Sequence, residues 1–372
     1  MAYSNVVNLK DAIDVYIGKE STIGTATVDG GTWYKMNNHL TNYSYQEVAS
    51  PVVYAPSKVK GTVDKSRHSA VTDFGAKMYE ITLEFVADAN VMNFLMFFCT
   101  HDWAGEQNMY PTAFQDSYMH GVTNTAVATH RTHTVSILFD KGASNGTDYL
   151  FPSCMLSNLS VSFDGGTNGG LGTISATFMT GYGPTIGTVT PSSSTVVGSA
   201  FNTVTDKMIW SATDVTAVGL KDLLMDSWSL NISRTINKVG LQSGADSTDC
   251  AGYVPSKWSV GGSFSCKRDT NFKELMDLQA VNNTGHSLNM LIEKNGTNGW
   301  NFSSATVSIE NYSIDFADNG FRVNCDYNCL ANDANDAVYV LQFCDASFTS
   351  KNLNGAFNTS FDGTSAAVPS AA

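Results

Sequence analysis

The chain has 372 residues, which suggests two domains at about 150 residues each. Its 31 glycines and 15% charged residues fit an all-β protein with many turns better than a helical one, and 42% hydrophobic residues exclude wholesale disorder. A formal net charge of −13 argues against a broad basic surface for nucleic acid and against docking on anionic lipid.

The N-terminal third predicts a strand followed by a short helix. The first residues show no basic stretch before an apolar run, so we expect no secretory signal. Residues Lys77–Phe85 alternate apolar and polar side chains, as a half-buried strand does. The apolar run Val91–Cys99 is far shorter than the about 20 residues that cross a bilayer, so we expect a buried helix over Ala89–Cys99 and no membrane contact.

The middle of the chain predicts a long loop and then a hairpin-built sheet. Residues 100–131 are polar, aromatic and turn-rich, and we interpret them as an inserted loop. The strand His133–Lys141 follows, then an Asn-Gly turn, which is a strong hairpin signal. Two more strands, ending at Asp164 and Met179, flank a glycine-rich turn.

The second half repeats this order. His286–Lys294 aligns with His133–Lys141, and an Asn-Gly-Thr turn follows in both halves. Tyr312, Ile314 and Phe316 align with Leu159, Val161 and Phe163. Upstream, Trp258–Cys266 precedes a helix capped by Asn271, as Lys77–Phe85 precedes the first helix. We therefore infer two tandem copies of one module.

The seven cysteines do not predict disulfides or a metal site. Their odd number in a long chain argues against a disulfide framework and favours a reducing compartment during synthesis. Four lie in strand-like segments, where a free cysteine behaves as a small hydrophobe: Cys154, Cys266, Cys325 and Cys329. Cys325 and Cys329, with Cys344 nearby, lack a CxxC partner and a histidine at ligand spacing.

No other motif predicts chemistry. His130 and His133 flank Arg131 without a third ligand or a nucleophile. The glycine-rich segment Asp164–Gly170 lacks the Gly-Lys-Ser/Thr ending of a phosphate loop, and Asn332–Asp336 lacks the glycine and final glutamate of a calcium loop. We therefore predict no catalytic, cofactor-binding or metal-binding residues, no cofactor, and no enzymatic activity.

The strand rhythms resemble those of one known family. They occur in Ser157–Asp164 with Ile174–Phe178, and in Ser227–Arg234 with Val260–Phe264. These segments resemble the tail tube (major tail) proteins of tailed bacteriophages, and the resemblance covers roughly residues 40–345.

The resemblance implies a mainly β protein made of two tandem tail-tube-like antiparallel β-sandwich or half-barrel domains, each with a short flanking α-helix. The first domain would span residues 1–185, with an N-terminal arm and the inserted loop. A linker or arm (186–222), a second domain (223–349) and a C-terminal tail (350–372) would follow.

In that family, rings of six domains stack into the tube through which DNA is ejected. A chain with two domains would build the ring as a homotrimer with pseudo-sixfold symmetry; a homohexamer is the alternative. The resemblance implies a virion protein, made and assembled in the host cytoplasm, with tape measure, terminator, baseplate or sheath proteins as further partners. Double-stranded DNA would pass without specific binding, because an acidic lumen repels phosphate.

Two other functions stay open on the sequence. A tail terminator or the tube of an injection system would share the fold. A glycan-binding β-sandwich module would instead use aromatic residues of the inserted loop: Trp103, Tyr110, Phe114 and Tyr118.

Overall fold

The protein is mainly β, as the composition predicts. The structure, a computed structural model, describes residues 13–20, 32–36, 40–54, 71–87, 91–92, 95, 134–141, 148–166, 168–187, 190–195, 200–203, 207–213, 221–223, 225–241, 250–256, 259–268, 270, 272–273, 276, 286–294, 298–316, 322–330 and 340–344. In this part of the chain 17 strands are linked by hydrogen bonds into one sheet system, and β13 and β14 form a separate pair.

The strands of the first half are β1 (Asp14–Lys19), β2 (Thr32–Lys35), β3 (Leu40–Tyr54), β4 (Val71–Val86), β5 (Val135–Asp140), β6 (Asp148–Asp164), β7 (Thr173–Thr180), β8 (Thr185–Gly187) and β9 (Ser192–Thr195). Those of the second half are β10 (Lys207–Thr213), β11 (Lys221–Leu223), β12 (Met225–Ser233), β13 (Ile236–Leu241), β14 (Cys250–Pro255), β15 (Ser259–Lys267), β16 (His286–Lys294), β17 (Asn298–Asp315), β18 (Arg322–Cys329) and β19 (Val340–Cys344).

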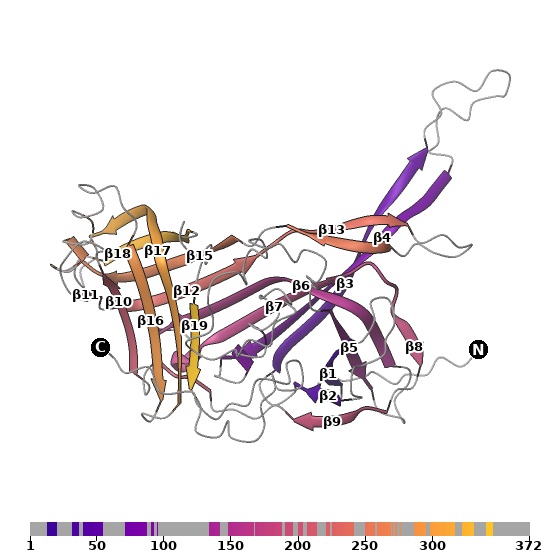
Figure 1. Ribbon diagram of the computed structural model, residues 1–372, viewed down its shortest axis with the longest axis horizontal. Helices are drawn as coiled ribbons and strands as arrows, with labels where there is room; N and C mark the ends of the chain where they lie inside the picture. Colours follow the sequence, from indigo (N-terminus) through magenta and orange to yellow (C-terminus); the bar gives the residue numbers. More distant parts are fainter. Residues whose placement is uncertain are drawn as a thin grey trace, which may run out of the picture.

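The long strand β6 organises the first half (Figure 1). Its first part pairs with β5 and β8, and its second part pairs with β7. From there β7 pairs with β4, and β4 with β3; on the other side β5 pairs with β1, and β1 with β2. A bulge separates the two parts of β6, so that this one strand pairs with β5 and β8 on one side of the bulge and with β7 on the other.

The second half has the same connectivity, with β17 in the place of β6. It pairs with β16 and β19 through its first part and with β18 through its second. Then β18 pairs with β15, and β15 with β12; on the other side β16 pairs with β10, and β10 with β11. Each pairing has its counterpart in the first half, and among the described strands only β9, parallel to β2, has none.

Shared irregularities fix which residues correspond. The β3–β4 register shifts between Leu40 and Asn42, and the β12–β15 register shifts between Met225 and Ser227. The β3–β4 register shifts a second time between Ala49 and Pro51, and the two strands then continue as a distal hairpin. At the matching place β12 and β15 end, and the separate β13–β14 hairpin continues them. The bulge positions make Tyr43 the counterpart of Trp228, and Tyr45 that of Leu230.

The bulge between β5 and β6 corrects one sequence alignment. Val135 pairs with Cys154 at this bulge, and His286 pairs with Val307 at the matching bulge between β16 and β17. Val135 is therefore the counterpart of His286, two residues away from His133, which lies outside the described residues. The side chains are still assigned to the same faces of the strand, because a displacement of two residues keeps each side chain on the same face.

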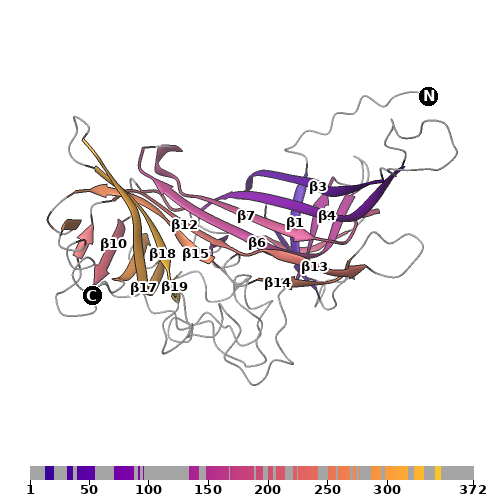
Figure 2. The same ribbon diagram turned by 90° about the horizontal axis from the view of Figure 1, so that it is seen from above.

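The two halves join edge to edge. Strand β12 pairs with β6, so that β3, β4, β7, β6, β12, β15, β18 and the second part of β17 follow one another in a single layer. Figure 2 shows this layer from above, running without a break from β3 to β15. The distal β3–β4 hairpin leaves the body of the protein, and the β13–β14 hairpin projects on the same side (Figure 1).

One hydrophobic core runs along the inner face of this layer. It gathers alternate side chains of β4, β6 and β7, for example Ile81, Leu83 and Phe85, and continues into β12, β15 and β18. Val15 and Ile17 of β1 close it from the opposite sheet of the first half. Alternation of buried and exposed positions along these strands is what the sequence predicts for half-buried strands.

Two segments bear on other sequence predictions. Val91, Met92 and Leu95 are helical and buried, and Phe272, Lys273 and Met276 are helical; the remaining residues of both predicted helices lie outside the described part, so the flanking helices stay predictions. The segment 186–222, predicted as a linker, contains β9, β10 and β11, which pair with strands of both halves. The tail 350–372 and the loop 100–131 lie outside the described residues.

Candidate assembly interface

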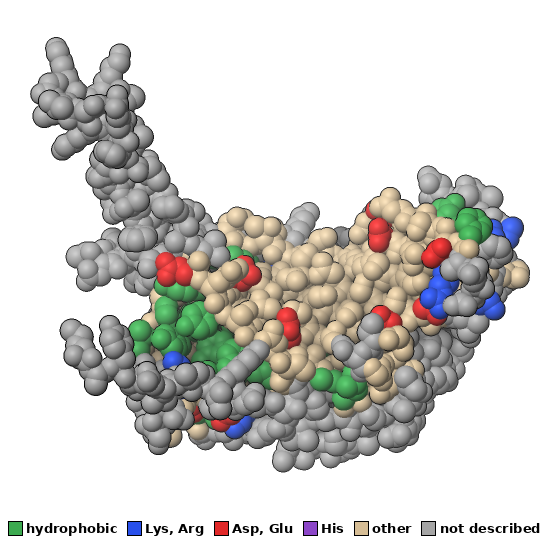
Figure 3. Space-filling view, turned by 180° about the vertical axis from the view of Figure 1, so that it is seen from behind, with side chains coloured by type: hydrophobic (Ala, Val, Ile, Leu, Met, Phe, Trp, Pro, Cys, Tyr) green, Lys and Arg blue, Asp and Glu red, His purple; other side chains and the backbone are tan. Residues whose placement is uncertain are grey.

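The outer face of the eight-strand layer is polar from one end to the other. Residues paired directly across neighbouring strands share a face, and one row across all eight strands holds only polar residues and one glycine: Asn42, Glu84, Ser175, Ser160, Asn231, Gly261, Asn328 and Ser308. Figure 3 shows a broad face on which uncharged polar side chains and backbone, both in tan, cover most of the area, with scattered acidic side chains and a hydrophobic patch at one end.

Hydroxyl pairs hold this polar face together. Ser162 Oγ lies 2.7 Å from Thr173 Oγ1, and Ser229 Oγ lies 2.9 Å from Ser263 Oγ. These pairs satisfy one another across strands and leave a surface that is neutral over much of its area. Among the described residues, the charges on the face are mostly acidic, such as Glu80. The basic residues Lys267 and Arg322 lie opposite each other on β15 and β18 at one end, where Arg322 Nε lies 3.3 Å from Asp226 Oδ2.

The joint between β6 and β12 is apolar on the inner face. Phe163 and Trp228 pair directly and stack, with ring centroids 6.1 Å apart, and both side chains are about 1% exposed. Val161 and Leu230 pair one step further and are fully buried. A joint with this degree of burial resembles the interior of a domain more than a transient contact.

Arg234 anchors the far end of the same joint. Its backbone N–H donates to Ser157 O over 2.8 Å, and its Nε donates to Leu156 O over 2.9 Å. The side chain is buried, with 7% of the residue exposed. A buried guanidinium that binds backbone carbonyls fixes the position of one strand against the other. Ala49 is the counterpart of Arg234 in β3, so this contact belongs to the β6–β12 joint.

The two ends of the layer are open. No described strand pairs with the outer edge of β3 or with the outer edge of the second part of β17. These edges are the counterparts of the two strands that meet in the joint, since β3 corresponds to β12 and β17 to β6. The chain therefore contains two edges of each kind. One of each is joined in the β6–β12 pairing, and the other two, on β17 and β3, are open at the ends of the layer.

Large hydrophobic side chains lie exposed along both open edges. Phe316 and Tyr312 of the β17 edge are 74% and 53% exposed, although their counterparts Phe163 and Leu159 are buried. Tyr45 of β3 is 46% exposed, and its counterpart Leu230 is buried. Ile314 keeps the inner face toward the core. The aromatic residues are therefore exposed at the two edges whose counterparts are joined and buried between β6 and β12.

The open β3 edge also carries an aromatic cluster. Tyr45 lies 5.2 Å from Phe151 and 5.8 Å from Tyr149, measured between ring centroids, and Tyr43 lies 5.4 Å from Phe139. Such a cluster offers a preformed apolar surface to a further aromatic side chain.

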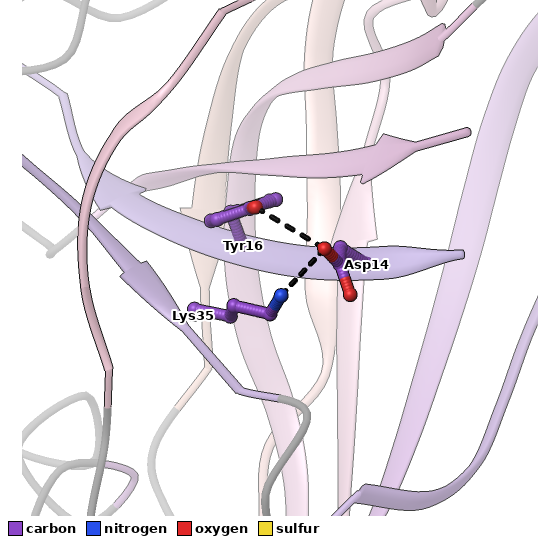
Figure 4. A network of polar contacts seen from close by, with 3 residues as sticks. All are labelled: Asp14, Tyr16 and Lys35. Atoms are coloured by element: carbon purple, nitrogen blue, oxygen red, sulfur yellow. Dashed lines mark hydrogen bonds and ion pairs between the residues drawn. The ribbon is translucent and has the colours of Figure 1, made fainter. Parts of the chain in front are cut away.

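Two polar clusters stabilise the first half. Asp14 accepts hydrogen bonds from Lys35 Nζ at 2.5 Å and from Tyr16 Oη at 3.4 Å, which ties β1 to β2 (Figure 4). Burial, with the nearby carboxylates of Asp14 and Asp140, raises the pKa of Tyr16 to about 12.

The second cluster surrounds the buried carboxylate of Glu20. It accepts hydrogen bonds from Ser136 Oγ at 2.7 Å, from Ser153 N at 2.5 Å and from Ser153 Oγ at 2.8 Å. Ser153 lies in the bulge of β6 with a φ of 53°, a conformation that costs energy for a residue with a side chain. Burial raises the pKa of Glu20 above its usual value, although these hydrogen bonds oppose the shift.

The residues that the sequence singled out for chemistry do not converge on a site. Cys154, Cys266, Cys325 and Cys329 are buried in strands and form no disulfide with one another, as predicted for cysteines that act as small hydrophobes. Asp164–Gly170 turns between β6 and β7, and Asn202 Nδ2 donates to Gly169 O there. His130, Arg131, His133, the segment Asn332–Asp336 and the four aromatic residues proposed for glycan binding lie outside the described residues.

Within the described ranges, no group of three or more histidine, cysteine, aspartate or glutamate residues could hold a metal ion, and no helix has the length and apolarity to cross a membrane.

No protein-family model and no curated protein matches this sequence. The sequence did not identify β3 and β17 as the strands with open edges, although the Tyr-x-Tyr pattern of Tyr43 and Tyr45 in a polar stretch was a signal for the first of them.

Proposed function

We propose that this protein is a structural virion protein that assembles head to tail into rings, and that the rings stack into the tail tube of a bacteriophage. Its two halves would be tandem tail-tube-like domains, each with a flanking helix. The observation that carries the proposal is the internal joint: β6 and β12 pair within the chain, and their counterparts β17 and β3 are open at its two ends.

A joint between two different edges is heterologous, so it adds subunits in one direction until the rotation closes a ring. Closure also removes the open strand edges, which otherwise promote aggregation. Because one chain supplies two equivalent modules, a ring of six modules would be a homotrimer with pseudo-sixfold symmetry; a homohexamer of twelve modules is the alternative.

The polar face supports the choice of a tube for DNA. Its hydroxyl, amide and scattered acidic groups suit a lumen along which phosphate slides without binding, and the basic residues described on this face lie at one end of it. The protein would then act without catalysis, in the virion tail, beside tape measure, terminator and baseplate or sheath proteins.

Negative-stain microscopy of the purified protein at increasing concentration tests this function. We expect rings with a central hole and stacks of such rings. A protein that stays monomeric at every concentration, or that forms particles without a pore, contradicts the proposal. A separate glycan array with no hits would argue against the binding-module alternative.

A further inference from the structure

We propose that β17 of one copy pairs with β3 of the next in the register of the β6–β12 joint, so that Ile314 lies opposite Tyr45 and Phe316 opposite Tyr43. This inference rests on the proposed head-to-tail assembly and names its contact. The occupant of each open edge is a second copy of this chain, because each edge is the counterpart of a strand that already has that partner inside the chain.

The register follows from two independent sets of correspondences. The apolar alternation aligns Val161 with Ile314, and the partners of these residues in β7 and β18 are Ile174 and Val323. Those residues in turn pair with Phe85 and Cys266 in β4 and β15. The shared bulges at the start of β3–β4 and β12–β15 give the same correspondence of Phe85 with Cys266 without using the apolar alternation.

The register places like with like on both faces. On the inner face, the stacked pair Phe163–Trp228 becomes Phe316 with Tyr43, beside the aromatic cluster around Phe139. On the polar face, the pair Ser162–Ser229 becomes Asp315 with Ser44. A slip of one residue would bring the aromatic side chains to the polar face, so the edges specify the register strongly.

Cysteine cross-linking of the whole chain tests the register. A chain with Ser44→Cys and Asp315→Cys carries both halves of the contact at opposite ends of the layer, so it can cross-link only between chains. We expect mild oxidation to give a ladder of linked chains on denaturing gels, ending in a closed species whose mass separates a trimer from a hexamer. Directly paired positions have Cβ atoms about 4.5–5.5 Å apart, near the upper end of the distance at which a disulfide forms.

Two matched variants calibrate the result. Ser44→Cys with Ser313→Cys displaces the second position by two residues on the same face and should cross-link little. Ser162→Cys with Ser229→Cys should cross-link within each chain, because these residues pair directly in β6–β12. Rings that cross-link through the Ser44/Ser313 variant, or through neither intermolecular variant, overturn the register and leave the assembly proposal standing. Absence of any assembled species overturns both.

The aromatic contact has a second test that needs no cysteine. Phe316→Ala should raise the protein concentration needed for rings by about 10- to 100-fold, as expected for losing the burial of one large apolar side chain. Leu330→Ala is the control, because Leu330 is 46% exposed and follows the last residue of β18, which pairs with Val307 at the end of the β17–β18 contact away from Phe316. Equal assembly by both variants overturns the aromatic contact.

Discussion

Phe163 of β6 and Trp228 of β12 stack across the line on which the two halves of the chain meet, and their ring planes are inclined by 24°. The pair is buried between segments that are far apart in the sequence. It therefore connects the folding of the first half to that of the second, and it provides the pattern for the contact proposed between chains.

Removing the larger partner of this pair should destabilise the monomer. We expect Trp228→Ala to lower the free energy of unfolding by about 3–5 kcal/mol, because it leaves a cavity in a buried joint. Denaturant titration measures the change. Phe316→Ala is the matched control: its side chain is 74% exposed in the single chain, so the monomer should lose little. Equal losses in both variants would contradict the assignment of buried joint and open edge.

Gly262 should tolerate no side chain. A Cβ atom there would lie 2.0 Å from Ser229 O and 2.8 Å from Tyr327 Oη, and the Tyr327 hydroxyl donates to that same carbonyl. We expect Gly262→Ala to destabilise by about 1–3 kcal/mol through overpacking. Gly187→Ala provides the comparison, since no atom lies within 4 Å of the added Cβ. Similar thermal midpoints for the two variants would show that the β12–β15 contact is looser than described.

Glu20 should make stability depend on pH. Burial raises its pKa in the folded state above the unfolded value, so the folded protein holds this proton more tightly. Its contribution is therefore greatest below the unfolded pKa and is lost as the pH rises through the folded pKa. Glu20→Gln removes the titration and keeps an oxygen acceptor for Ser136 and Ser153. The difference in unfolding free energy, wild type minus variant, should fall from pH 4 to pH 8; a constant difference would refute the assignment.

Four cysteines should resist alkylation in the native protein. Burial raises the pKa of Cys325 to about 12, with a smaller effect from Asp326, and burial also raises the pKa of the Cys154 thiol. The reactive thiolate is therefore scarce at pH 8, and access is closed as well. Peptide mass spectrometry should find Cys154, Cys266, Cys325 and Cys329 labelled only after denaturation. Rapid native labelling of these sites would place them at the surface.

Positive charge on the polar face should slow DNA in assembled tubes. Ser160→Lys with Ser175→Lys puts two cations on neighbouring strands of this face, where the residues pair directly. We expect tubes of this variant to retain double-stranded DNA, with retention falling steeply as salt rises. Ile186→Lys adds a charge on β8 and should behave as wild type. Identical DNA retention by both variants would mean that the polar face does not line the lumen.

The alternating segments were predictable because their pattern is local. Lys77–Phe85 and Leu159–Phe163 alternate, and β4 and β6 have the expected sides buried. Strands such as β1 and β2 were not predicted, because they are short and gain their stability from distant partners such as β5 and β9. The repeat also aligned Tyr312 and Phe316 with Leu159 and Phe163, but the exposed fraction of a side chain depends on which strand lies beside it, and the periodicity of one strand does not contain that information.

The Arg234 contact would make the joint within the chain stronger than the contact proposed between chains. The joint that contains Arg234 forms within one molecule, so the effective concentration of its two halves is set by the chain that connects them and does not change on dilution. The proposed contact between molecules has alanine in that place and depends on how many copies are present. A closed ring of this kind would dissociate at every second joint, the one between chains, and would release intact chains of two modules each.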